Sequence, residues 1–350
     1  MKLVILALLF ALAGCQSGVL SPGVPGASSV GRFGFNGTPH GRPNHLYVSV
    51  APESNPNYAS VERFLLVNGI PRTKPDRVYS GGQGMLDIIA VSTDGTLYAA
   101  GLSSESLTVY AFDGGSNKPD RKIQVPYPHH CGSFSSRATE ISALAADPQG
   151  NLFVGILTFD QEASRRVNAM VSPEASVHAP CNGVAIFAPN AKGQAKPIQS
   201  IDLGPLGWVN SLAVDTNDNL YVGDYPTNIL EYANAVQDPK EIRLLQTHSA
   251  GWVSSLATDA AGDIFIANTN YQTAVIDRYA PGASQGPNNE IQLSGSGFHT
   301  LQSIAVRGRD LYAQDQISSI DLYHARKNGP QSPFYSLTTS GYFRFVAVGP

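Results

Sequence analysis

The chain has 350 residues and is rich in the two residues that interrupt regular structure, with 34 Gly and 24 Pro, while only 14% of its residues are charged. A formal net charge of −4 without a basic run argues against nucleic acid as a partner. The sequence shows no long amphipathic helical period, so we expect a single all-β domain.

The first 14 residues have the build of an export signal. Met1-Lys2 is a short positive region, and the apolar run from Leu3 to Ala13 is too short to span a bilayer. The tetrad LAGC that ends at Cys15 resembles the lipobox of bacterial lipoproteins. This resemblance implies that residues 1–14 are removed and that Cys15 carries the lipid that anchors the mature chain to a membrane. The alternative is an ordinary secretory signal in which the cysteine is accidental.

Residues 15–43 are mostly Gly, Ser and Pro, a composition typical of a tether between an anchor and a folded domain. Gln16 stands where inner-membrane lipoproteins often have Asp. We therefore expect a protein of the bacterial cell envelope that is exported and placed at the outer membrane or cell surface rather than at the inner membrane.

From residue 44 to residue 350 four short phrases recur six times. The first phrase consists of apolar and small residues. In the second phrase an aromatic residue follows a Leu or Ile. The first phrase reads DIIAVS from Asp87, SALAAD from Ser142, NSLAVD from Asn210, SSLATD from Ser254, QSIAVR from Gln302 and RFVAVG from Arg344. A third phrase ends in an aromatic, and a fourth follows a Pro at residues such as Pro75 and Pro330. Four strands per unit at a period of roughly 40 to 50 residues predict a six-bladed β-propeller with four-stranded blades.

The two ends of the repeat complement each other. His45 to Val50 is a second phrase that has no first phrase before it, and Arg344 to Gly349 is a first phrase that has no second phrase after it. We expect the C-terminal strand to pair in the N-terminal blade, because this completes six blades and removes two exposed sheet edges. A closed ring of this kind is expected to be a monomer.

With Cys15 assigned to lipid, two cysteines remain. An even remainder in an exported protein favours one disulfide between Cys131 and Cys181, which would close a loop of about 50 residues and contribute roughly 4 kcal/mol. Two free buried thiols are the alternative. Cys181 lies near the end of an insertion between Ile156 and Asn182.

The first phrases also supply the candidate ligand-binding residues. Each begins with a residue that should face the central channel near one of its two mouths, and these six residues are Asp87, Ser142, Asn210, Ser254, Gln302 and Arg344. Two residues earlier, on the rim, stand Met85, Glu140, Trp208, Trp252, Thr300 and Tyr342. Aromatic rings beside hydrogen-bonding groups predict a platform for a small ligand or glycan. The alternatives are a water-filled polar channel and tryptophans that stack between blades.

The phrases N-L-Y-V and I-x-x-Y-A resemble the NHL-repeat propellers over residues 44–350, and more loosely the six-bladed gluconolactonase-like family. The strand pattern is also similar to that of a bacterial lyase of streptogramin-type antibiotics, for which a catalytic His is expected. The gluconolactonase-like resemblance implies a divalent metal held by Glu, Asn and Asp at channel positions. In this chain Asn210 matches one such position, while Ser254 and Gln302 stand at those of the next two blades. Asp87 and Glu140 are the nearby carboxylates and His299 is the His near the mouth, so a metal site would have to use Asp87, Glu140, Asn210 and His299.

Two functions from different classes follow. The first is a lipid-anchored propeller that acts as a rigid binding or scaffold module for a protein, peptide or glycan, without a cofactor. The second is an exported, metal-dependent hydrolase or lyase whose site lies at the channel mouth. The incomplete metal-ligand set favours the binding module, because hard cations need several converging oxygen ligands.

Overall fold

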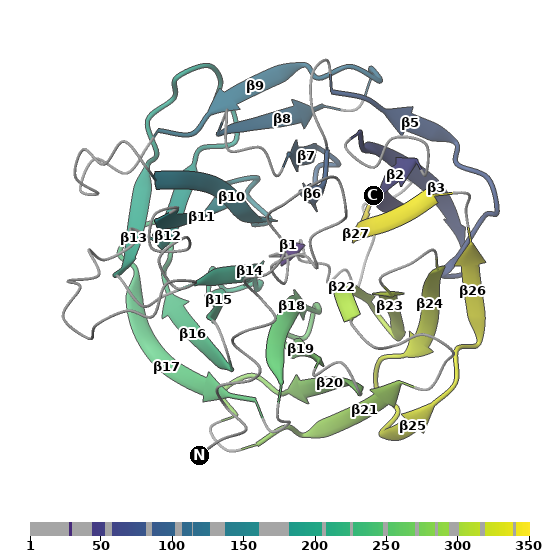
Figure 1. Ribbon diagram of the computed structural model, residues 1–350. Helices are drawn as coiled ribbons and strands as arrows, with labels where there is room; N and C mark the ends of the chain where they lie inside the picture. Colours follow the sequence, from purple (N-terminus) through teal and green to yellow (C-terminus); the bar gives the residue numbers. More distant parts are fainter. Residues whose placement is uncertain are drawn as a thin grey trace, which may run out of the picture.

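The computed structural model is a ring of six β-sheets around a central axis (Figure 1). It describes residues 28–29, 44–52, 58–81, 86–101, 107–113, 115–126, 137–160, 182–204, 208–224, 227–247, 251–269, 273–283, 286–293, 301–315, 319–338 and 341–350. All regular elements in these ranges are strands. The prediction of an all-β, six-bladed β-propeller is therefore confirmed.

Each sheet forms one blade, and we number the blades I to VI in chain order. Blade I contains β2 (His45–Pro52), β3 (Ser60–Val67), β4 (Ile70–Pro71), β5 (Arg77–Tyr79) and β27 (Gly341–Gly349). Blade II contains β6 (Ile88–Val91), β7 (Leu97–Ala100), β8 (Thr108–Phe112) and β9 (Arg121–Gln124). Blade III contains β10 (Arg137–Ala146), β11 (Leu152–Asp160), β12 (Asn182–Phe187) and β13 (Gln199–Gly204).

The other three blades follow the same order from the axis outward. Blade IV contains β14 (Val209–Val214), β15 (Leu220–Asp224), β16 (Asn228–Ala233) and β17 (Lys240–Gln246), with β1 (Ser28–Ser29) added to it. Blade V contains β18 (Trp252–Thr258), β19 (Ile264–Thr269), β20 (Ala274–Tyr279), β21 (Asn289–Leu293) and β25 (Gly329–Gln331). Blade VI contains β22 (Leu301–Arg307), β23 (Asp310–Asp315), β24 (Ser319–His324) and β26 (Tyr335–Thr338).

The ring closes as the sequence predicts. β27 pairs antiparallel with β2, with His45 opposite Gly349 at one end and Pro52 opposite Gly341 at the other. The Tyr47 hydroxyl donates a hydrogen bond to the carbonyl of Pro350 at 3.1 Å, which holds the last residue of the chain. The innermost strand of blade I thus comes from the opposite end of the chain.

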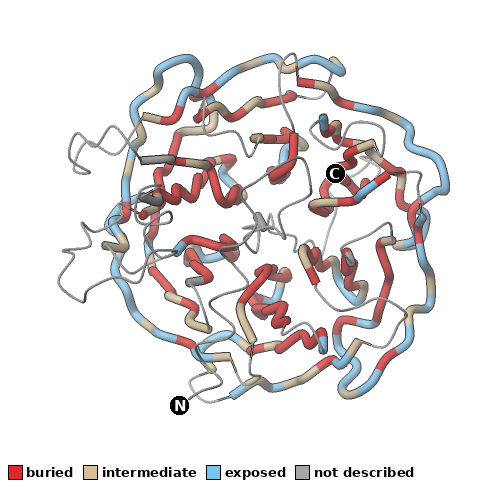
Figure 2. Tube along the Cα trace, in the orientation of Figure 1, coloured by how far each residue is buried: buried red, intermediate tan, exposed pale blue. Residues whose placement is uncertain are grey.

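The inner strands are mostly buried, whereas the outer strands of the ring carry many exposed residues (Figure 2). The aromatic of the second phrase is at most 1% exposed in all six blades, at Tyr47, Tyr98, Phe153, Tyr221, Phe265 and Tyr312. These large side chains fill the space between blades, which widens away from the axis, as the sequence predicts.

In blades III and IV the turn between the first and second strands is closed by a buried carboxylate. The backbone N–H of Asn219 donates to Asp215 Oδ1 at 3.0 Å, and its side-chain amide donates to Asp215 Oδ2 at 2.9 Å. Asp147 receives the same two bonds from Asn151. Such Asx turns explain why the phrases DPQGN and DTNDN recur. We call this end of the ring the far end, and the end where the inner strands begin the mouth.

Neighbouring inner strands are joined by serine side chains. The Ser255 hydroxyl accepts a hydrogen bond from the backbone N–H of Ile304 at 3.0 Å, and the Ser303 hydroxyl accepts one from Val346 at 3.1 Å. These serine side chains give the backbone N–H groups of Ile304 and Val346 a partner in the neighbouring blade.

Blade VI differs in detail from the sequence prediction. Pro330 was expected to precede its outer strand, but it lies within β25, which pairs parallel with β21 of blade V. The outer strand of blade VI is β26, which follows Pro333. The connection before β26 therefore covers the exposed edge of the preceding blade, which removes an open sheet edge.

The segment expected to be a tether contributes one strand pair to the ring. Ser28 and Ser29 of β1 pair parallel with Ser211 and Leu212 of β14, and β1 lies at the centre of Figure 1. The sequence did not indicate this pairing.

Candidate functional site

The six channel positions of the sequence analysis stand at one level of the ring, and five of them are β-bulges. In each of these five, the pairing register skips the polar residue between its two neighbours, as at Asn210 between Val209 and Ser211. The five bulged residues are Ser142, Asn210, Ser254, Gln302 and Arg344. A bulge takes one residue out of the ladder and re-aims its side chain. The repeated bulge therefore makes a distinct polar ring near the mouth, which we call the bulge ring.

Asp87 completes the bulge ring in blade II, directly before β6. Its backbone N–H donates to the carbonyl of Ala100 at 2.9 Å. Its carboxylate is fully buried and lies 3.4 Å from the Nε atom of Arg344, measured to Oδ1. This ion pair joins blade II to the closing strand of blade I, so the charge of each group is compensated within the ring.

Two members of the ring keep unused hydrogen-bonding capacity. Ser142 and Asn210 are each 2% exposed, and neither Ser142 Oγ nor Asn210 Nδ2 has a hydrogen-bond partner among the described residues. By contrast, the hydroxyl of Ser254 donates to the carbonyl of Ala267 at 3.2 Å. Buried polar atoms without partners are rare and costly, so those of Ser142 and Asn210 require an explanation.

Aromatic side chains stand above this ring at the mouth. Trp208 and Tyr342 are each 37% exposed, and Trp252 is half-buried as the first residue of β18. Trp208 precedes β14, so the two tryptophans hold equivalent positions in neighbouring blades. This exposure favours a rim position for Trp208 over burial between blades. Met85, Thr300 and His299 of the predicted rim lie outside the described residues.

Glu140 is the rim residue of blade III. It precedes the bulge of β10 and lies opposite Leu157 of β11. Burial raises the pKa of its carboxyl to about 7. A carboxyl with this pKa donates a hydrogen bond in its neutral form and accepts one when ionised, which makes it a rim group whose chemistry changes near neutral pH.

The predicted metal-ligand set lies only partly within the described residues: Asp87, Glu140 and Asn210 are described, whereas His299 is not. In the described part of the chain, no group of three or more His, Cys, Asp and Glu side chains could hold a metal ion. Asp87 has the cationic side chain of Arg344 beside it. By themselves, the three described members of the set offer few oxygen ligands for a hard divalent cation.

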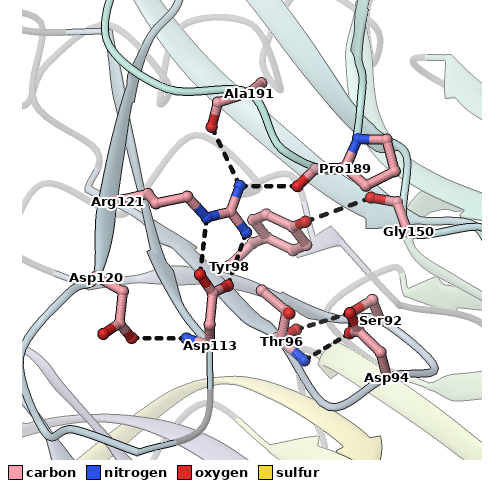
Figure 3. A network of polar contacts seen from close by, with 10 residues as sticks. All are labelled: Ser92, Asp94, Thr96, Tyr98, Asp113, Asp120, Arg121, Gly150, Pro189 and Ala191. Carbon is pink, nitrogen blue, oxygen red and sulfur yellow. Dashed lines mark hydrogen bonds and ion pairs between the residues drawn. The ribbon is translucent and has the colours of Figure 1, made fainter.

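A dense charged network of the ring lies at the far end and is structural (Figure 3). Arg121 makes a bidentate pair with Asp113, at 2.8 Å from Nε and 2.7 Å from Nη2, and lowers the pKa of that carboxyl. The same guanidinium donates to the carbonyl of Pro189 in blade III at 2.7 Å, and the Tyr98 hydroxyl donates to the carbonyl of Gly150 at 3.3 Å. The network therefore joins blade II to blade III.

Several sequence predictions fall outside the described residues. These are the export signal at residues 1–14, the lipidated Cys15 and both partners of the expected disulfide, Cys131 and Cys181. Among the described residues, no helix is long and apolar enough to cross a membrane.

The bulges themselves escaped the sequence analysis, although a signal was present. Each of the phrases VNSLAV, VSSLAT and LQSIAV has two polar residues in succession, which breaks the alternation of a half-buried strand. Such a break, repeated at one position of a repeat, indicates a bulge.

Comparison with known proteins supports the fold but does not indicate a ligand or an activity. No family model and no curated protein matches the chain. A solved structure of a luciferin-regenerating enzyme matches with a TM-score of 0.50 and 13% identity over 83% of this chain and 85% of that one. Apo AztD from Citrobacter koseri matches with a TM-score of 0.47 and 11% identity over 87% of this chain and 97% of that one. A chain of a mitotic checkpoint complex matches with a TM-score of 0.45 and 13% identity over 72% of this chain, which spans 66% of that chain. The likeness to the luciferin-regenerating enzyme agrees with the propeller fold, and at 13% identity it shows nothing about a ligand.

Proposed function

We propose that the protein is a binding module that takes a polar ligand at the mouth of its channel. The observation that carries this proposal is the layering at the mouth: exposed aromatics stand above a ring with buried polar atoms that lack partners. Trp208 and Tyr342 provide the exposed surface, and Ser142 and Asn210 provide the unused hydrogen-bonding groups.

The energetics favour a ligand that supplies hydrogen bonds. A buried polar atom without a partner costs about 1–3 kcal/mol, and a ligand that satisfies it recovers that free energy on binding. The Ser142 hydroxyl can donate and accept, while Asn210 Nδ2 donates only. Aromatic rings add stacking against a flat or sugar-like face. A glycan or a peptide combines both properties, so these are the ligand classes that we propose.

The described residues give the catalytic alternative less support. No group of three or more His, Cys, Asp and Glu side chains among them could hold a metal ion, and the channel carboxylate Asp87 is paired with Arg344. The chain is therefore proposed to bind and present its ligand, as propellers that act as scaffolds do.

We place this module in the bacterial cell envelope as part of the same proposal. The support is the sequence LAGC at Cys15 after an apolar run, and the even remainder of two cysteines, Cys131 and Cys181. The variant Cys15→Ser should move from the detergent phase to the aqueous phase on phase partition. Equal partition of variant and parent into detergent would contradict the lipid anchor.

Non-reducing mass mapping should yield a peptide that links Cys131 to Cys181, and alkylation of both thiols would contradict the disulfide.

The binding proposal is tested on glycan and peptide arrays with four proteins: the full chain, Trp208→Ala, Trp252→Ala and Phe334→Ala. Phe334 is the matched control, because it is an exposed aromatic (43%) that stacks on His324 in blade VI rather than at the mouth. We expect both tryptophan variants to lose at least about tenfold in affinity, equivalent to about 1.4 kcal/mol, while Phe334→Ala binds like the parent. Equal binding by all four proteins would refute the site.

A further inference from the structure

The far end of the ring carries a hairpin with two exposed apolar side chains. β3 and β4 are joined by Asn68 and Gly69, whose φ angles of 52° and 82° are both positive, as a two-residue type I′ turn requires. Val67 lies opposite Ile70 across this turn, and the two residues are 48% and 39% exposed. Because directly opposite residues of a strand pair share one face, these two side chains form a single apolar tip.

Blade VI holds the hairpin in place. The Tyr312 hydroxyl donates a hydrogen bond to the carbonyl of Gly69 at 2.7 Å, and the Tyr335 hydroxyl donates one to the carbonyl of Pro71 at 3.1 Å. The carboxylate of Asp310 occupies the place where a Cβ of Gly69 would lie. The tip is therefore fixed at the junction of blades I and VI.

A third exposed apolar side chain adjoins the tip. Phe334 precedes β26, is 43% exposed and stacks on His324 with 4.7 Å between the ring centroids. His324 lies opposite Asp310, the residue that packs against Gly69, so this ring and the hairpin belong to one continuous surface. Single exposed apolar residues are common, whereas adjoining ones mark a contact surface. We call Val67, Ile70 and Phe334 the apolar patch.

Cations surround the apolar patch, although the whole chain has a net charge of −4. The far-end connections of blades I and VI are residues 66–77, 307–310 and 324–335. Against the carboxylates Asp76 and Asp310 they contain Arg72, Lys74, Arg77, Arg307, Arg309, Arg326 and Lys327. Asp76 pairs with Arg63, and Arg326 pairs with two carboxylates of blade V. The exposed cations without an ion pair in the described part of the chain are Arg72, Lys74, Arg309 and Lys327.

Exposed apolar side chains within a basic rim fit the surface of an anionic membrane. The apolar groups can enter the boundary between headgroups and acyl chains, while Lys and Arg contact the anionic headgroups. Nucleic acid would match the charges through its phosphates but would give the apolar patch no role. The two properties together therefore favour a lipid surface.

We propose that the far-end surface of blades I and VI docks on an anionic membrane, with the apolar patch at the lipid boundary and the surrounding cations at the headgroups. This inference rests on the proposed place of the protein at a membrane of the cell envelope. It does not depend on the ligand proposed for the mouth, because the mouth is the opposite end of the ring. A molecule docked in this way leaves the mouth open to solvent.

Vesicle sedimentation of the full chain with Cys15→Ser tests the surface without a lipid anchor. We expect binding to vesicles of phosphatidylcholine and phosphatidylglycerol, at least about tenfold weaker binding to phosphatidylcholine alone, and weaker binding as salt rises. Equal binding to both vesicles would overturn the proposal. So would binding to neither, which is the result expected for an acidic protein partner. Either failure leaves the lipid anchor standing, because phase partition of the parent tests that separately.

A pair of charge variants in the same background locates the contact. Each cation near an anionic surface contributes roughly fivefold to binding, so Arg72→Ser/Lys74→Ser should bind these vesicles at least about tenfold more weakly. Lys192→Ser/Lys196→Ser is the matched control, because it removes two exposed lysines between β12 and β13 of blade III, across the ring from blade VI (Figure 1). Equal losses in the two variants would show a general attraction and overturn the assigned surface.

A pair of apolar variants tests the patch itself. Val67→Ser/Ile70→Ser should weaken vesicle binding at least about tenfold, because binding at an interface scales with the buried apolar area. Ile242→Ser/Leu244→Ser is the control, since these residues of β17 are 56% and 50% exposed but lie in blade IV. Unfolding midpoints of both variants establish that the fold is kept. Unchanged binding by Val67→Ser/Ile70→Ser, or the same loss in the control, would refute a role for the patch.

Discussion

Truncation of Phe343 to alanine tests the closure of the ring. Phe343 lies in β27 opposite Val50 of β2 and is 1% exposed within the core. A buried phenylalanine removes roughly 150–200 Å² from water, which at about 25 cal/mol per Å² amounts to about 4–5 kcal/mol. The methyl group of alanine retains part of this and the cavity adds to the loss, so we expect Phe343→Ala to cost about 3–5 kcal/mol. This is a large fraction of the stability of an ordinary domain.

Urea unfolding of the full chain measures this loss as a lower midpoint. Tyr342→Ala is the control, because the neighbouring side chain is 37% exposed and its removal should change stability by less than about 1 kcal/mol. A loss below about 1 kcal/mol in Phe343→Ala, or equal losses in both variants, would refute closure of the core by β27. Deletion of residues 341–350 should have the larger consequence of an exposed edge on β2, which is measured as aggregation.

Two further predictions concern charges near the mouth. Burial raises the pKa of Glu140 from 4.5 to about 7, so the unfolded chain loses this proton at lower pH than the folded one. The free energy of unfolding of the parent, relative to that of Glu140→Gln, should therefore fall as pH rises from about 4.5 to about 7 and stay constant above that range. A difference in unfolding midpoint between the two proteins that does not change with pH would contradict this prediction. Arg344→Met leaves the buried carboxylate of Asp87 without this cation and should cost up to about 3–5 kcal/mol, while Asp87→Asn/Arg344→Met recovers part of the loss. Additive losses in this double-mutant cycle would show that the pair does not interact.

Most of the fold could be predicted from the sequence repeat. Six copies of the first phrase and six of the second predicted the number of blades, and the unmatched phrases at His45 and Arg344 predicted the closing pair that β2 and β27 form. These features are predictable because each copy makes the same local choice of strand, turn and core residue. The equivalent position in each first phrase also marked the six candidate residues that form the bulge ring, although not that five of them are bulged.

The remaining features depend on contacts between distant parts of the chain. The bulges at residues such as Asn210 arise where the register of two strands shifts, and the pairing of Ser28 with Ser211 joins segments that no repeat relates. Pro330 was assigned to the wrong strand because the connection before β26 covers blade V instead of continuing blade VI. The raised pKa of Glu140 results from burial, which the composition of a strand does not show.

Tryptophan fluorescence tests the central claim, that ligand binds at the mouth. The chain has two tryptophans, Trp208 and Trp252, at equivalent positions before or at the start of the inner strands of blades IV and V, so tryptophan emission excited selectively over the tyrosines reports on the mouth. The full chain is titrated with the glycan or peptide that gives the strongest array signal, and its affinity is measured independently by calorimetry. Our account predicts a saturable change in emission with the calorimetric Kd, and at least about tenfold weaker binding when Trp208 or Trp252 is replaced by alanine. Calorimetric binding that leaves the emission unchanged and survives both substitutions, or no saturable binding by any array member, would contradict it.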